Sequence, residues 1–150
     1  MCLTGNFGLA MLLDSPVLAP VLAQPSLPLA LTPALRRGLH ASPAELAAAH
    51  DKIDRQGVRL LGLRFEADRV CPRARFDQLR AEFGAAFEGI EIPDSAANPA
   101  GPGSPHSVLA EHLIDELGQP TRAALDRTLV FLKEHLYRTK SPGAEPSSRN

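Results

Sequence analysis

The sequence is short of cysteine and has almost no tryptophan or tyrosine. Its 150 residues include no tryptophan, one tyrosine and two cysteines, Cys2 and Cys71. Two cysteines are too few for a disulfide framework, so we expect free thiols. Free thiols persist in reducing compartments, which favours a cytoplasmic protein. A chain of this length forms one domain at most.

The charge has no excess of either sign. The chain has 16 lysine and arginine residues against 17 aspartate and glutamate residues, which gives a formal net charge of -1. We therefore expect no nucleic-acid partner and no membrane partner, since both select basic surfaces. The histidines follow no zinc-site spacing, so we expect no metal. We expect no organic cofactor either.

The sequence also lacks an uninterrupted hydrophobic run that could cross a bilayer. Residues 1–23 are strongly apolar, but Gly5, Asp14, Pro16 and Pro20 interrupt them. The stretch has no basic start of the kind that a signal peptide carries. We interpret it as a buried helix followed by a buried strand.

Short apolar segments alternate with segments of helical periodicity along the chain. This alternation predicts an α/β fold in which a mostly parallel sheet of about three strands is flanked by helices. Residues 24–41 form a surface excursion, and residues 140–150 predict a disordered tail after a domain of residues 1–139. Predicted strands cover residues 17–23, 58–65 and 87–92, the last edge-like, and predicted helices cover residues 6–13, 43–56, 72–83, 107–117 and 120–137.

Three residues that could act together lie beside the ends of predicted elements. Cys2 lies immediately before the first helix, where unpaired N–H groups favour a thiolate. Asp68 follows the second predicted strand, and His106 closes the long loop after the third. Because sites in parallel sheets form at the carboxyl ends of the strands, we expect these side chains to lie close together. Their chain order, nucleophile then acid then histidine, is that of α/β-hydrolases.

Three segments resemble the dienelactone hydrolase family of α/β-hydrolases. MCLTG at residues 1–5 is similar to its nucleophile elbow, RFEADRVCP at residues 64–72 to its acid loop, and SPHS at residues 104–107 to its histidine loop. The resemblance covers most of residues 1–137. It implies that the chain is a partial α/β-hydrolase, the C-terminal half of the family's domain. The missing N-terminal half would hold about four or five further strands. Ala110 stands where the founding enzymes carry a substrate-binding arginine, so we expect a divergent branch.

The resemblance implies hydrolysis of a small-molecule ester or lactone through an acyl-enzyme. Cys2 would be the nucleophile, His106 the general base and acid, and Asp68 the group that orients the imidazole. The backbone N–H of Leu3 would donate to the oxyanion. Weaker candidates for substrate contact are Gln24, Arg64 and Arg69.

Each candidate also has a simpler interpretation. Asp68 could cap the following helix, which would leave Glu66 as the acid. His106 could be a solvated loop histidine, and Cys2 a small buried hydrophobe. For four other residues the simpler interpretation is preferred: Cys71 as structural, and Arg64, Arg69 and His112 as solvated surface residues.

A second function remains open. The chain could be a non-catalytic fragment or an interaction module derived from an α/β-hydrolase, because Met1 falls within the elbow segment. An elbow without its preceding strand is not held in its strained conformation, so we expect the chain by itself to be inactive. A serine-type relative ranks last, since no serine lies in an elbow-like context. The sequence predicts no oligomeric state.

Overall fold

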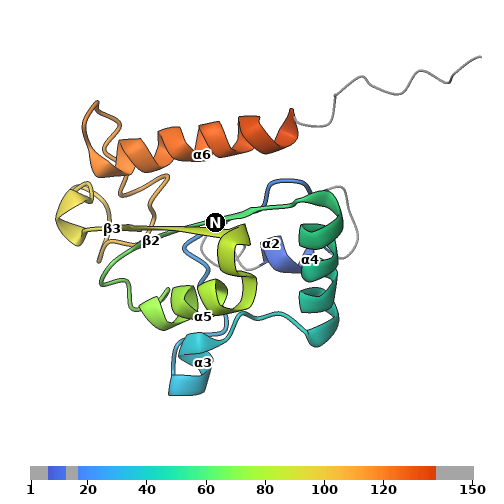
Figure 1. Cartoon of the computed structure of the whole chain (residues 1–150). Helices are drawn as coiled ribbons and strands as arrows, with labels where there is room; N and C mark the ends of the chain where they lie inside the picture. Colours follow the sequence, from blue (N-terminus) through green and yellow to red (C-terminus); the bar gives the residue numbers. More distant parts are fainter. Residues whose placement is uncertain (1–6, 13–16, 138–150) are drawn as a thin grey trace, which may run out of the picture.

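A parallel sheet lies at the centre of the molecule (Figure 1). The computed structural model describes residues 7–12 and 17–137. Within the described residues the sheet has three strands, β1 (Val21–Ala23), β2 (Leu60–Phe65) and β3 (Phe87–Ile92), which lie side by side in this order. The predicted α/β architecture, a small parallel sheet flanked by helices, is confirmed at this level.

β1 is shorter than predicted because Pro20 lies within the apolar run. A proline has no N–H to donate to a strand ladder, so regular pairing begins at Val21, which lies opposite Leu61. The carbonyl of Pro20 still accepts the N–H of Leu61 at 3.1 Å. β2 begins two residues later than predicted, and all of its residues are buried. β3 has the predicted bounds, and its Phe87 lies opposite Leu60.

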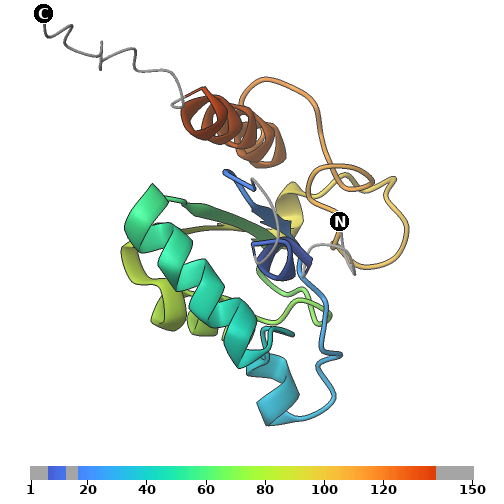
Figure 2. The same ribbon diagram turned by 90° about the vertical axis from the view of Figure 1, so that its right-hand side faces the viewer.

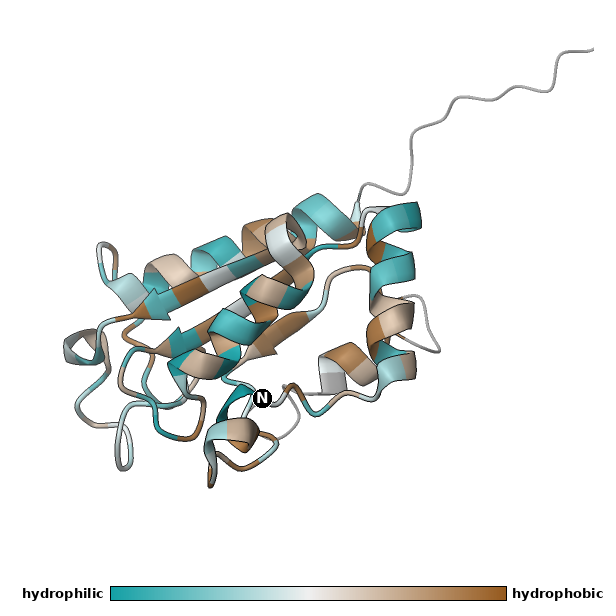
Figure 3. Cartoon of the chain, turned by 60° about the horizontal axis from the view of Figure 1, so that its bottom comes forward, coloured by the Kyte–Doolittle hydropathy of each residue, from teal (hydrophilic) through white to brown (hydrophobic). Residues whose placement is uncertain are grey.

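Helices cover both faces of the sheet and give three layers (Figures 1 and 2). α4 (Pro43–Gln56) and α5 (Arg73–Phe83) lie on one face with the short α2 (Phe7–Ala10), and α6 (Pro120–Leu136) lies on the other. α4, α5 and α6 carry both hydrophilic and hydrophobic residues, as expected where one side faces a core (Figure 3). The cluster beneath α4 and α5 includes Leu60, Phe76, Leu79 and Phe87, and the cluster beneath α6 includes Leu61, Leu63, Phe65 and Phe131.

α4 begins and ends as its sequence predicts. The hydroxyl of Ser42 accepts the N–H of Glu45 at 3.3 Å, and the Glu45 carboxylate accepts the N–H of Ser42 at 2.5 Å. This reciprocal capping box satisfies two N–H groups that would otherwise lack a partner. Gly57 ends the helix with a φ of 65°, a left-handed conformation that glycine adopts without strain. α5 and α6 lie within one residue of their predicted bounds.

The predicted helix over residues 107–117 is wrong, since the segment forms turns instead. The carbonyl of Ser107 accepts the N–H of His112 at 3.0 Å and that of Ala110 at 3.5 Å. The ring of His112 accepts the N–H of Ser107 at 3.2 Å. The N–H of His112 thus bonds five residues back and that of Ala110 three residues back, whereas a helix would bond each N–H to the carbonyl four residues back, so the apolar spacing of the segment misled the prediction.

The excursion of residues 24–41 contains a short helix, α3 (Pro33–Arg37), that was not predicted. Thr32 caps it by accepting the N–H of Leu35 at 3.2 Å, and none of its residues is buried. Across the described ranges, no helix combines the length and the apolar character needed to cross a membrane. The predicted tail, residues 140–150, lies outside the described residues.

Candidate active site

Two loops meet at the carboxyl edge of the sheet. The acid loop, residues 66–72, follows β2, and the histidine loop, residues 98–113, follows β3 and the short 3-10 helix η2 (Asp94–Ala96). The N–H of Ala67 donates to the Asp94 carboxylate at 3.0 Å, which joins the acid loop to the residues after β3. The side chains that follow neighbouring parallel strands are therefore held together, where sites in such sheets form.

The Asp68 carboxylate and the His106 ring lie in hydrogen-bond contact. Nδ1 of His106 is 2.6 Å from Oδ2 of Asp68, and the side chains are 22% and 2% exposed, respectively. A buried carboxylate in this position orients the ring and stabilises its charged form. Proton exchange with a reacting group then falls to Nε2. Glu66, the other candidate acid, has an exposed side chain.

The second oxygen of Asp68 holds the acid loop in shape. Oδ1 accepts the N–H of Val70 at 2.8 Å and that of Cys71 at 3.0 Å. These bonds form an Asx-type turn that leads into α5. The N-cap residue of α5 is Pro72, which makes no side-chain cap. Asp68 therefore does not cap α5: one of its oxygens holds the acid loop, and the other faces the histidine.

Arg64 is buried, and the prediction of a solvated surface residue is wrong. Its side chain is 1% exposed and pairs with the carboxylate of Glu91 on β3. It also donates to the carbonyls of Glu66 at 2.7 Å and Cys71 at 2.9 Å. A guanidinium held in this way stabilises both ends of the acid loop and is not open to a substrate. The sequence shows an arginine in an apolar strand, but its charged partner, Glu91, lies on a strand that only the fold brings close.

A cleft opens between the acid loop and the histidine loop. Its volume of about 640 Å³ is within the range of small-molecule sites. Of the three weaker candidates, Arg69 alone lines it, and Arg69 is exposed as predicted. Asp94 was missed, although it lies two residues after a predicted strand. The lining residues are Ala67, Asp68, Arg69, Val70, Asp94, Ser104, Pro105 and His106.

Gln24 lies at the carboxyl end of β1 but is not among the residues that line the cleft. Its N–H donates to the carbonyl of Leu63 at 2.7 Å, and its φ is 37°. The side chain is buried, and Oε1 has no hydrogen-bond partner among the described residues. The side chain is therefore buried rather than open to a substrate in this cleft.

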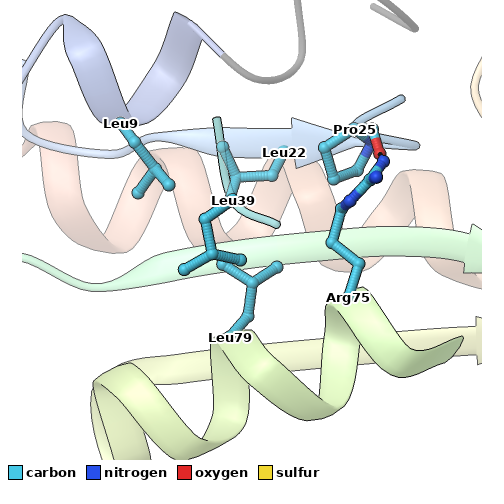
Figure 4. A pocket seen from close by; sticks show the side chains of 6 residues that line it. All are labelled: Leu9, Leu22, Pro25, Leu39, Arg75 and Leu79. Carbon is cyan, nitrogen blue, oxygen red and sulfur yellow. Dashed lines mark hydrogen bonds between the residues drawn. The ribbon is translucent and has the colours of Figure 1, made fainter. Parts of the chain in front are cut away.

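A separate cavity on the α5 side of the sheet is too small for a substrate (Figure 4). It has a volume of about 10 Å³, which is roughly the space that one water molecule needs. Its walls are largely apolar, so it is a packing defect of the core rather than a site. The residues around it are Leu9, Leu22, Pro25, Leu39, Arg75 and Leu79.

Cys71 is buried as a free thiol. Burial, followed by the charge of the nearby Asp68 carboxylate, raises the pKa of Cys71 to about 12. The thiol therefore stays protonated at neutral pH, and a protonated buried thiol is a poor nucleophile. This is the structural role that was predicted. The predicted nucleophile, Cys2, and the predicted oxyanion donor, Leu3, lie outside the described residues.

His112 is also buried, and its prediction as a surface residue is wrong. Its side chain lies under the histidine loop, where Nδ1 accepts the N–H of Ser107 at 3.2 Å and that of His106 at 3.5 Å. The error follows from the helix predicted over residues 107–117, which would have pointed this side chain to solvent. His106 and His112 are six residues apart, a spacing at which two residues do not touch in a helix or in a strand. The sequence therefore does not predict the bond between the His112 ring and the N–H of His106.

No group of three or more His, Cys, Asp or Glu side chains in the described part of the chain could hold a metal ion. No family model matches the chain, and neither curated proteins nor solved structures gave a match. The geometry of the two loops is therefore what bears on function.

Proposed function

We propose that the protein is a cytoplasmic acyl hydrolase of the dienelactone hydrolase type, with a small ester or lactone as its substrate. The contact between Asp68 and His106 in a cleft carries the proposal. A buried acid and a partly exposed histidine in this contact are two of the three members of a hydrolytic triad. Cys2, which precedes β1 in the sequence, supplies the nucleophile in the chain order of α/β-hydrolases.

The proposed reaction has two halves. In the first, Nε2 of His106 takes the thiol proton of Cys2, and the sulfur bonds to the acyl carbon. The tetrahedral intermediate collapses to a thioester as the C–O bond breaks, and the leaving oxygen takes the proton from His106. In the second half, His106 deprotonates water, whose oxygen bonds to the thioester carbon. The C–S bond then breaks, and the thiolate recovers its proton as the acid product leaves.

Other groups stabilise charge during these steps. The Asp68 carboxylate favours the imidazolium form of His106 that arises in each half. The backbone N–H of Leu3 would donate to the oxyanion of both tetrahedral intermediates. Arg69, in the wall of the cleft, is the candidate contact for a negatively charged part of the substrate. Ala110 offers no such contact, which favours a substrate other than a dienelactone.

The test is acylation that depends on Cys2. The chain as printed and the longest in-frame product of its gene are incubated with short-chain p-nitrophenyl esters and with lactones, and both turnover and protein mass are measured. We expect an acyl adduct on Cys2, which Cys2→Ala abolishes and which His106→Ala strongly slows. Cys71→Ala is the matched control, since it makes the same chemical change at a buried thiol and should leave acylation intact.

Two results would contradict the proposal. One is hydrolysis that is unchanged in Cys2→Ala, because the acyl-enzyme would then play no part. The other is the absence of both acylation and turnover in both forms of the protein. The second result would favour the alternative function, an interaction module derived from a hydrolase.

A further inference from the structure

The ring of His112 holds the histidine loop from the inside. Its Nδ1 accepts two consecutive backbone N–H groups, that of His106 at 3.5 Å and that of Ser107 at 3.2 Å. The backbone N–H of His112 in turn donates to the carbonyl of Ser107 at 3.0 Å. Hydrogen bonds in both directions thus close the turn, and this turn carries the histidine that contacts Asp68.

The neighbours of this ring fix its position. The ring of Phe65, the last residue of β2, meets the His112 ring in a T-shaped contact with centroids 6.0 Å apart. Gly101 lies so close that a Cβ added there would approach Cδ2 of His112 to 2.6 Å. The carbonyl of His112 accepts the N–H of Asn98 at 2.9 Å. His112 is therefore held against the strand from which the acid loop starts.

The same contacts determine which ring nitrogen carries the proton. A nitrogen that accepts hydrogen bonds has no proton, so the neutral His112 ring holds its proton on Nε2. Nε2 is buried and has no hydrogen-bond partner among the described residues. A buried donor without a partner is costly, so Nε2 does not explain why a histidine is buried here. The two hydrogen bonds that Nδ1 accepts do explain it.

We infer that His112 is a positioning residue for the proposed hydrolase, and the inference rests on that proposed function. Its Nδ1 sets the backbone of residues 106 and 107, and so the placement of the His106 ring against Asp68. Without this acceptor, the partly buried N–H groups of His106 and Ser107 need other partners, and the turn shifts. A displaced general base slows the chemical steps more than it weakens substrate binding.

Two amide variants of His112 test the Nδ1 acceptor, because both remove the ring but only one keeps an acceptor in its place. The side-chain oxygen of His112→Asn falls near the place of Nδ1, whereas that of His112→Gln falls near the place of Nε2. We expect kcat to fall by about tenfold to a hundredfold in His112→Gln, with little change in KM, and by less than about threefold in His112→Asn. NMR gives a readout without turnover: the deshielded Nδ1–H proton of His106 should stay sharp in His112→Asn and broaden in His112→Gln.

The unaltered chain provides a check that does not depend on the variants folding. The ¹⁵N shifts of the His112 ring should identify the tautomer with its proton on Nε2. A proton on Nδ1, or equal losses in the two variants, overturns the inference. The chain could hydrolyse no ester while the Nδ1–H resonance of His106 stays sharp in His112→Asn and broadens in His112→Gln. In that case the proposed function fails and the positioning role of His112 stands.

Discussion

At the residue scale, the two carboxylate oxygens of Asp68 have different roles, one in the acid loop and one in the contact with His106. Oδ1 accepts the N–H groups of Val70 and Cys71, and Oδ2 faces Nδ1 of His106. Because a carboxylate is planar, the first pair of bonds also fixes the direction of the second contact. The turn that leads into α5 therefore orients the acid before any substrate is present.

Replacing Asp68 by asparagine should remove activity and leave the fold. In Asp68→Asn the amide oxygen can still accept from the acid loop, but the NH₂ group faces His106 and cannot accept its proton. We expect kcat/KM to fall by about 10⁴-fold, with a nearly unchanged thermal midpoint. Asp68→Ala loses both sets of bonds and should also lower the free energy of unfolding by about 1–3 kcal/mol. Ester kinetics and thermal melts measure both effects, and equal destabilisation by the two variants would contradict this division.

Cys71 makes the stability of the protein sensitive to alkaline pH. Its pKa is raised from the usual 9.0 to about 12, so the unfolded chain loses this proton at a lower pH than the folded chain. The stabilisation is complete below pH 9 and is lost as the pH rises towards about 12. Urea unfolding across this range should show a steeper fall in the free energy of unfolding than in Cys71→Ala, where the group is absent. Parallel curves for the two proteins would contradict the prediction.

Reasoning from the sequence predicted the meeting of the acid and the histidine but failed for two buried polar residues. Asp68 and His106 were expected to meet because each follows a parallel strand, and they lie in contact. Arg64 and His112 were assigned to the surface because polar side chains are exposed on average. Their burial depends on partners from distant elements, such as Glu91 for the arginine, and only the tertiary fold assembles such partners.

At the scale of elements, α5 anchors the surface excursion through one arginine. Arg75 is buried, and burial lowers the pKa of its guanidinium, which nevertheless stays charged. Carbonyl dipoles from two segments of the excursion and from the acid loop surround the charge. The acceptors are the carbonyls of Pro25, Pro28, Leu35, Gly38 and Val70.

Removing this anchor should expose α3 to proteolysis. Arg75→Met loses the charged donors, so the segment that contains Arg36 and Arg37 should open more often. We expect trypsin to cut after these two residues at least about tenfold faster, as measured by mass spectrometry of timed digests. Arg73→Met is the matched control, because it removes an exposed arginine from the same helix. Similar cleavage rates in the two variants would show that Arg75 does not hold the excursion.

Local signals predicted the elements whose ends are fixed locally. The capping box at Ser42 and the glycine at position 57 set the bounds of α4 without reference to the rest of the chain. The segment over residues 107–117 has helical apolar spacing, yet its N–H groups are taken by the ring of His112 and by turns. These bonds join residues that are close in the chain but do not follow the four-residue step of a helix, so the apolar spacing alone does not show them.

At the scale of the whole molecule, β2 joins the two hydrophobic clusters. Leu60 belongs to the cluster beneath α4 and α5, whereas Leu61, Leu63 and Phe65 belong to the cluster beneath α6. Successive residues of a strand point to opposite faces, so lost packing on one face also loosens the strand that supports the other. Alternating strands and helices predicted this layered arrangement, but not which helix covers which face.

Phe131→Ala tests whether the two faces unfold together. Phe131 is buried in the cluster beneath α6, whereas Leu129 on the same helix is 46% exposed. We expect the free energy of unfolding to fall by about 3–5 kcal/mol in Phe131→Ala and by less than about 0.5 kcal/mol in Leu129→Ala. Because the faces share β2, urea should still produce one transition, with the same midpoint by far-UV and near-UV circular dichroism. An early transition that removes the signal of α6 alone would show that the faces are independent. The histidine loop would then keep its contacts on the sheet side, among them those of His112 with Phe65 and of His106 with Asp68.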